Sequence, residues 1–181
     1  MKQYLVRGFT AILLSFCIVL LGCSFATAQT TVNIIGSVIA IAQADLPSLE
    51  ATGIIPLPDQ LAVNAILALA SALDKQAATC ITQDQAAGNL KSAFAACFET
   101  FASSFASSSE LAALHILSPS AQKQTQIWVA AIQTALFSVI VAFGGTVPLA
   151  AASNNVITSP EYKAFEARVK ADHKAHPHRV L

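Results

Sequence analysis

The spacing of apolar residues after position 28 predicts helices. Ile34, Val38 and Ile41 recur at helical intervals between Gln29 and about Ala44. The β-branched residues of this segment would also suit a buried strand, but no second candidate strand lies nearby to pair with it. We therefore expect a helix over residues 29–44.

Proline and glycine then predict a connector and a second helix. Pro47 and Gly53 punctuate the chain, and residues 54–58 should be extended because a residue that precedes proline is pushed out of the helical region. The apolar character of this segment leads us to expect it to lie across the helices rather than in solvent. A helix should run from Pro58 to about Ala78. Its expected core face is Leu61, Ala65, Ala68, Ala72 and Leu73, widened by Ile66, Leu67 and Leu69.

The third helix carries the clearest stripe of the chain. One face of it gathers large apolar residues and a cysteine, namely Leu90, Phe94, Cys97, Phe98, Phe101 and Phe105. We interpret the phenylalanines as core packing. The alternative is a groove for a small apolar ligand.

Ser118 and Pro119 predict the start of a fourth helix that runs to Phe143, because serine caps a helix and proline suits its first position. No charged residue lies between Gln124 and Pro160. Residues 127–149, from Ile127 to Leu149, could therefore be a membrane-spanning helix. The apolar run is short and carries a central glutamine, so we favour the central helix of a bundle. Gln122, Gln126 and Gln133 share one side and should reach water, and residues 146–158 should be a loop with a turn at Asn154 and Asn155.

The last segment, residues 159–181, differs from the rest in its charge. Ser159 and Pro160 again predict a helix start, and Tyr162, Phe165 and Val169 form a narrow apolar face. Five of the eight basic residues that follow position 28 lie in this segment. We expect a docked, solvated helix that frays at its end. Weak contact with anionic lipid is the alternative.

The N-terminus has the features of an export signal. Lys2 and Arg7 precede an uncharged apolar run of about 13 residues, which is short for a spanning helix. Two processing signals follow. Residues 20–23 resemble a lipobox, in which Cys23 would be lipidated and become the new N-terminus, and residues 26–28 form an A-x-A site, in which cleavage would follow Ala28. We favour Cys23, so that the signal covers residues 1–22. It would cover residues 1–28 if cleavage followed Ala28. An uncleaved N-terminal anchor is the remaining alternative.

Cys80 and Cys97 are the two cysteines that remain in the body. Because exported proteins enter an oxidising compartment, we expect a disulfide between them. A helix that started at Thr82 would place Cys97 about 20 Å along its axis, out of reach of Cys80. We therefore predict a break near Gly88, with residues 81–88 folded back so that Cys80 lies alongside Cys97.

Composition excludes some classes of function. Charged residues make up only 11% of the chain, and the part after Ala28 has two more acids than bases, which argues against a nucleic-acid-binding protein. No nucleophile elbow, zinc-binding motif, dinucleotide fingerprint or P-loop is present. His173, His176 and His178 could hold a metal, but we assign them no role because the chain end provides no rigid second shell. We expect no catalytic residues, cofactor or metal.

These observations predict an all-α protein: one helical bundle of about five helices with one intrachain disulfide, preceded by a cleaved export signal. Its parts are an apolar helical body over residues 29–158 and the charged C-terminal helix and tail. We expect an exported, non-catalytic envelope protein, tethered to a lipid membrane through Cys23, with a protein partner or self-association as further contacts. The alternatives are a membrane-embedded protein and a soluble secreted carrier of a small apolar ligand.

Overall fold

The computed structural model describes residues 25–87, 92–143, 145 and 154–178. The described chain is all-helical: five long helices and one single helical turn, with no strand among these residues. The elements are α2 (Phe25–Ala51), α3 (Leu57–Ala87), α4 (Ser92–Ala113), α5 (Pro119–Ala142), α6 (Asn154–Ile157) and α7 (Pro160–Ala175). The predicted fold class is therefore confirmed.

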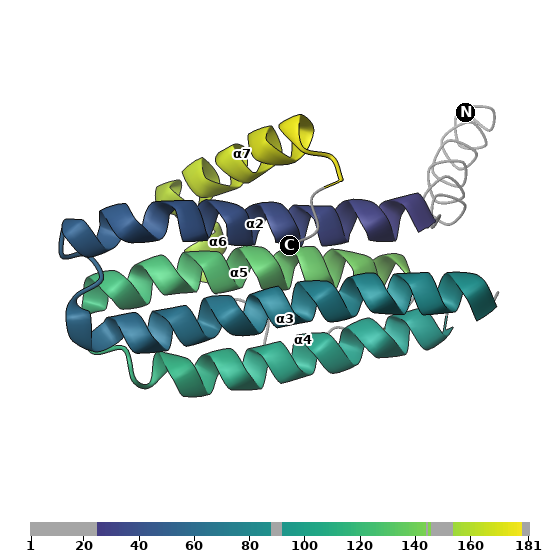
Figure 1. Cartoon of the computed structure of the whole chain (residues 1–181), viewed down its shortest axis with the longest axis horizontal. Coiled ribbons are helices and arrows are strands. Elements are labelled where there is room, and N and C mark those ends of the chain that lie inside the picture. The colour runs from purple at the N-terminus through teal and green to yellow at the C-terminus, as the bar shows by residue number, and fades with distance from the viewer. Residues whose placement is uncertain (1–24, 88–91, 144, 146–153, 179–181) are drawn as a thin grey trace, which may run out of the picture.

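Four helices form the body of the bundle. Each packs against two neighbours, with α3 between α2 and α4, and α5 between α4 and α2. Short connections join them, so successive helices run in opposite directions, and α7 lies along the outside against α2 and α5 (Figure 1). The largest side chains of the core are fully buried: Trp128, Phe98, Ile35, Ile39, Ile66 and Leu136.

The first helix is longer than the sequence predicted. α2 begins at Phe25 and continues through Pro47 to Ala51, where the sequence predicted a connector. Pro47 lies on the exposed side of α2, and so does Gln43, whose carbonyl group proline leaves without a helical partner. Water can satisfy that carbonyl group, so the helix does not have to end there. The chain turns instead at Gly53, which has a φ of 73°.

The connector lies across the helices only in part. Ile55 is buried, but Leu57 is already in α3 and is 81% exposed. The predicted core face of α3 is also partly wrong. Ile66, Leu67 and Leu73 are buried as expected, whereas Leu61 is 82% exposed and the three predicted alanines, Ala65, Ala68 and Ala72, face solvent. The buried face uses instead Ala62, Val63, Ala70, Ala77 and Ile81. Because α3 is apolar on nearly all sides, the spacing of its apolar residues is compatible with more than one buried face.

The break between the second and third helices is where the sequence placed it. α3 ends at Ala87 and α4 begins at Ser92, on either side of Gly88. The predicted route to the disulfide is wrong, however, because residues 81–87 continue α3 instead of folding back. Leu90 lies outside the described residues. Phe98 and Phe105 are buried, and Phe101 packs edge-on against Phe98, which confirms the core interpretation for these three.

The fourth and last helices begin where the sequence predicted, and the fourth also ends there; the end of the last helix does not fray as predicted, because Asn33 donates a hydrogen bond to the Pro177 carbonyl group. Ser118 precedes α5 and Phe143 follows it, although the Ser118 hydroxyl makes no capping hydrogen bond. Gln122 and Gln126 are exposed, but Gln133 is buried and does not extend the predicted polar stripe. Asn154 and Asn155 belong to the helical turn α6 rather than to a loop. In α7, Ser159 caps the helix by accepting a hydrogen bond from the Tyr162 backbone N–H, and Tyr162, Phe165 and Val169 are buried as predicted.

Candidate interaction surface

Large apolar side chains gather in solvent at one end of the bundle. Eight of them are exposed among the described residues, and six come from two short segments that flank the connections. We call these six the leucine face: Ile54, Leu57, Leu61, Leu111, Leu114 and Leu117. Its five leucines are 65–82% exposed. Exposed apolar patches of this kind mark surfaces that contact another molecule.

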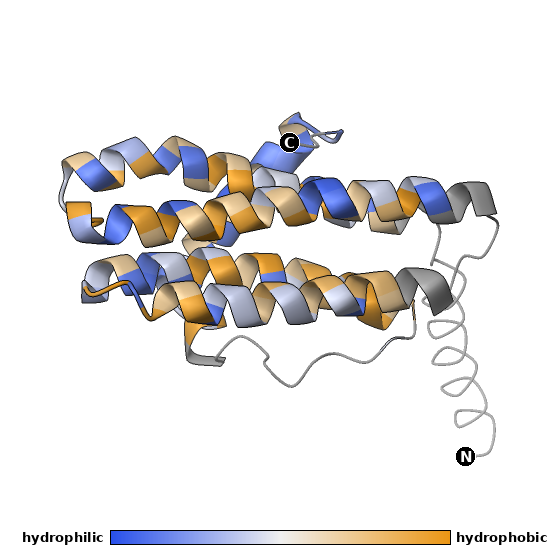
Figure 2. Cartoon of the chain, turned by 60° about the horizontal axis from the view of Figure 1, so that its bottom comes forward, coloured by the Kyte–Doolittle hydropathy of each residue, from blue (hydrophilic) through white to orange (hydrophobic). Residues whose placement is uncertain are grey.

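The leucine face lies where the α2–α3 turn meets the connection between α4 and α5 (Figure 1). Apolar colour marks the α4–α5 connection at this end (Figure 2). This is the end opposite to the start of α2. At 1.5 Å per residue, the 27 residues of α2 separate the two ends by about 40 Å.

Polar contacts hold the backbone under the leucine face. Asp59 is fully buried and its carboxylate accepts two hydrogen bonds, from the backbone N–H groups of Leu117 at 2.8 Å and Ser118 at 2.9 Å. The Ser120 hydroxyl donates to the Ile54 carbonyl group at 2.8 Å, and the Gln122 side chain donates to the Ile116 carbonyl group at 2.7 Å. These bonds tie the two connections together, so the exposed leucines stand on a fixed scaffold.

The charges around the leucine face are few. Neither of its two segments, residues 54–61 and 111–117, contains a lysine or an arginine. Glu110 and His115 are exposed at its edge. A surface that binds anionic lipid carries basic residues among its apolar ones, and these two segments contain none.

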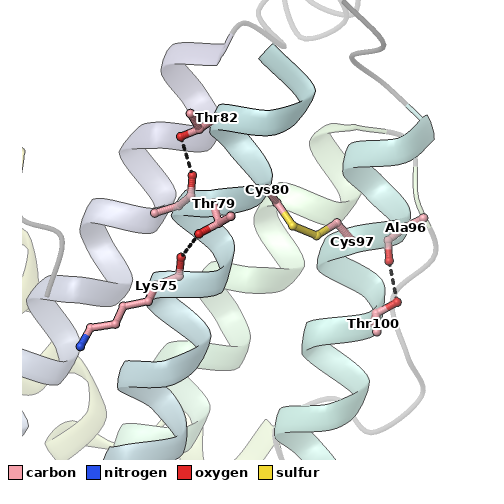
Figure 3. The surroundings of a disulfide bond; sticks show 8 residues. Lys75, Thr79, Cys80, Thr82, Ala96, Cys97 and Thr100 are labelled. Carbon is pink, nitrogen blue, oxygen red and sulfur yellow. Dashed lines mark hydrogen bonds between the residues drawn. A yellow bond between two sulfur atoms is a disulfide. The ribbon is translucent and has the colours of Figure 1, made fainter. Parts of the chain in front are cut away.

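The two remaining cysteines lie at the other end of the same helical hairpin. Cys80 of α3 and Cys97 of α4 are within disulfide distance, with 6.9 Å between their Cα atoms (Figure 3). Nearby threonines bond only within their own helices: Thr79 donates to the Lys75 carbonyl group and Thr100 to that of Ala96. The predicted pairing is therefore geometrically available, as a link between two antiparallel helices.

A groove of about 410 Å³ lies between α2, α5 and α7. Its charged side chains pair with one another or with a neighbour. Arg168 donates two hydrogen bonds to Asp45, at 2.7 and 2.8 Å, and Lys123 donates to Glu161 at 2.7 Å. The hydrogen bond from Lys123 lowers the pKa of Glu161, and that to Asp45 raises the pKa of Arg168. Charges that are already paired leave no obvious acid, base or nucleophile here.

The C-terminal histidines do not form a metal site within the described part of the chain. No group of three or more His, Cys, Asp or Glu residues that could hold an ion occurs there. His176 faces Asp172 at 3.1 Å, one helical turn away, and Asn33 of α2 donates to the Pro177 carbonyl group. This end of α7 is thus docked onto α2.

Sequence reasoning missed the leucine face. It placed Leu61 in the core, and it assigned no role to Leu111, Leu114 and Leu117. The signal that could have found the face is a leucine within two residues of a proline in each connection, Leu57 before Pro58 and Leu117 before Pro119, with no basic residue in either segment. Cys23, the predicted lipidation site, lies outside the described residues.

No protein-family model matches this chain, and neither the curated proteins nor the solved structures compared with it gave a match. Function must therefore be argued from the residues and the fold.

Proposed function

We propose that this chain is an exported, non-catalytic protein of the cell envelope. In this proposal, lipid on Cys23 tethers it to a membrane, and its helical bundle acts through contacts with protein. The support comes from the start of α2 and from the leucine face.

The observation that carries the tether is the position of Ala28. α2 begins at Phe25, and Ala28 is fully buried in the core of the bundle. Cleavage after Ala28 would remove the first turn of α2 together with this core residue. Cleavage before Cys23 keeps Ala28 and every other described residue of α2. The fold therefore favours the lipobox over the A-x-A site.

The leucine face supports a role in contact rather than in catalysis. It is the largest gathering of exposed apolar side chains in the described residues, and it lies about 40 Å from Phe25, at the other end of α2. A lipid on Cys23 would leave this end free of its own membrane. The paired charges of the α2–α5–α7 groove and the absence of a metal-binding group in the described residues give no competing catalytic site.

The membrane-embedded alternative has less support. Two segments are long and apolar enough to cross a bilayer by length and composition, Ala28–Ala51 and Pro119–Ala142. About half of each is buried against other helices, as in the core helices of a soluble bundle. The exposed positions of α5 are mostly polar, among them Gln122, Gln126, Thr134 and Ser138. A spanning helix would present apolar side chains there.

The ligand-carrier alternative rested on the phenylalanines of the third helix. Phe98 and Phe105 are buried in the core, and neither lines the groove between α2, α5 and α7. Both side chains pack against other helices in the core, so they offer no support for a carrier of an apolar ligand.

Metabolic labelling with an alkyne fatty acid tests the tether. The wild type should incorporate the label, and Cys23→Ala should lose it. Cys17→Ala is the matched control, because it removes a cysteine from the same segment but should keep the label. In carbonate extraction, the wild type should stay with the membrane. A wild type without label, or a cleaved Cys23→Ala chain that still resists carbonate, would overturn the proposal.

A further inference from the structure

We infer that the leucine face is a dimer interface, occupied by the leucine face of a second copy of this chain. The inference rests on the proposal that this surface makes a protein contact, and it names the partner. Its evidence from exposure and charge stands without the Cys23 tether, whereas the argument from a common orientation of the copies uses it.

The area of the face fits a dimer. With five leucines 65–82% exposed and Ile54 37% exposed, the face presents on the order of 600 Å². A two-fold contact that buried the whole patch on both copies would cover about 1,200 Å² in total, at the lower end of the range for specific interfaces. One patch thus suffices for an isologous dimer, the commonest arrangement of soluble oligomers.

The chemistry of the face is self-complementary. Its centre is apolar and carries no exposed charge, so two copies meet without burying like charges. At its edge, Glu110 and His115 are exposed on the same segment. A two-fold contact that brought Glu110 of one copy opposite His115 of the other would do so twice, with each carboxylate accepting a hydrogen bond from an imidazole.

The shape of α3 favours copies that lie side by side. Beyond Leu57 and Leu61, the exposed side of α3 continues with Ala65, Ala68 and Ala72. These positions follow one another at intervals of three or four residues, so they form one strip along the helix. Small side chains let a second helix approach closely. Two copies tethered to one membrane would hold their bundles in the same direction, which suits contact along this strip and raises their effective concentration.

Cysteine cross-linking in intact cells tests the pairing in the full chain. Leu114→Cys places a thiol on the leucine face, where the side chain is 75% exposed, and Val141→Cys places one at a site 61% exposed near the far end of α5. Under mild oxidation, Leu114→Cys should give a covalent species of twice the chain mass, and Val141→Cys should give none.

A second variant measures affinity without a new thiol. Leu61→Gln should leave the helical circular dichroism unchanged, because the side chain is 82% exposed, and should weaken self-association about tenfold or more. Val141→Gln is the control and should leave association unchanged. Sedimentation of the purified full mature chain, reconstituted in nanodiscs that each hold one or two copies, gives the ratio of dimer to monomer.

The outcomes separate the possible occupants. A cross-link of Leu114→Cys to a different protein would overturn the inference but keep the protein-contact proposal. A monomer without any cross-link would overturn both that proposal and the dimer, while leaving the Cys23 label unaffected. A wild type that incorporates no fatty-acid label but still dimerises would overturn only the tether.

Discussion

Breaking the disulfide between Cys80 and Cys97 should lower stability by an amount that the sequence separation sets. The two cysteines are 17 residues apart, and in the chain-entropy model a loop of that length contributes about 3 kcal/mol to the free energy of unfolding. For a chain of this size, that loss corresponds to a decrease of about 6–12 °C in the unfolding midpoint.

The disulfide is one of two ties that hold this helical hairpin together, one near each end. At the other end of α3 and α4, Asp59 accepts its two hydrogen bonds from Leu117 and Ser118. Cys80 lies 21 residues after Asp59, and Cys97 lies 21 residues before Ser118, so the two ties hold the same antiparallel register. At 1.5 Å per residue they stand about 31 Å apart. Reduction removes the tie between Cys80 and Cys97, whereas the hydrogen bonds to Asp59 at the other end remain.

Urea unfolding followed by circular dichroism measures the effect. The oxidised wild type should be about 3 kcal/mol more stable than the reduced one, with a similar dependence on urea. The control is Cys80→Ala/Cys97→Ala, whose midpoint should not respond to reductant. Oxidised and reduced protein of equal stability, or two free thiols in the denatured, unreduced chain, would refute the reasoning.

The other predictions concern burial, capping and acid sensitivity. Leu67→Ala should cost about 2–5 kcal/mol, because Leu67 is 3% exposed, whereas Leu61→Ala on the same helix should cost less than about 0.5 kcal/mol in dilute, monomeric protein; equal urea midpoints would contradict the register of α3. Asp59→Ala should cost about 2–4 kcal/mol, since two backbone N–H groups lose a buried, charged acceptor; a loss below about 1 kcal/mol in urea unfolding would contradict this role. The pKa of Glu161 is lowered by Lys123, so this carboxylate stabilises the fold above its unfolded pKa, and the effect is lost as the pH falls through the lowered pKa. Glu161→Gln should therefore lose less stability than the wild type on acidification, and identical pH profiles would count against the pair.

The sequence was sufficient for those elements whose ends carry local signals. Ser118 with Pro119, and Ser159 with Pro160, mark the starts of α5 and α7 because capping and proline geometry depend only on neighbouring residues. The stripe of phenylalanines predicted the buried face of α4 because small and polar residues occupy the rest of that helix. The requirement that Cys80 reach Cys97 placed the break between α3 and α4.

The sequence was insufficient where several faces of a helix are equally apolar. α3 can bury either the side of Leu61 or the side of Leu67, and only its packing between α2 and α4 decides between them. Pro47 and the buried Asp59 show the same limit. Whether a proline ends a helix depends on whether water reaches the freed carbonyl group, and the partners of Asp59 lie 58 and 59 residues away. The same choice of register exposes Leu57 and Leu61, so their place on the leucine face could not be assigned before the fold was known.

The central claim is that the mature chain begins at a lipidated Cys23 and keeps all of α2. Intact-mass measurement of the protein purified from membranes tests it most directly. The account predicts a chain of residues 23–181 with the added mass of a thioether-linked diacylglycerol. A chain that begins at Gln29, or one that retains residues 1–22, would contradict it.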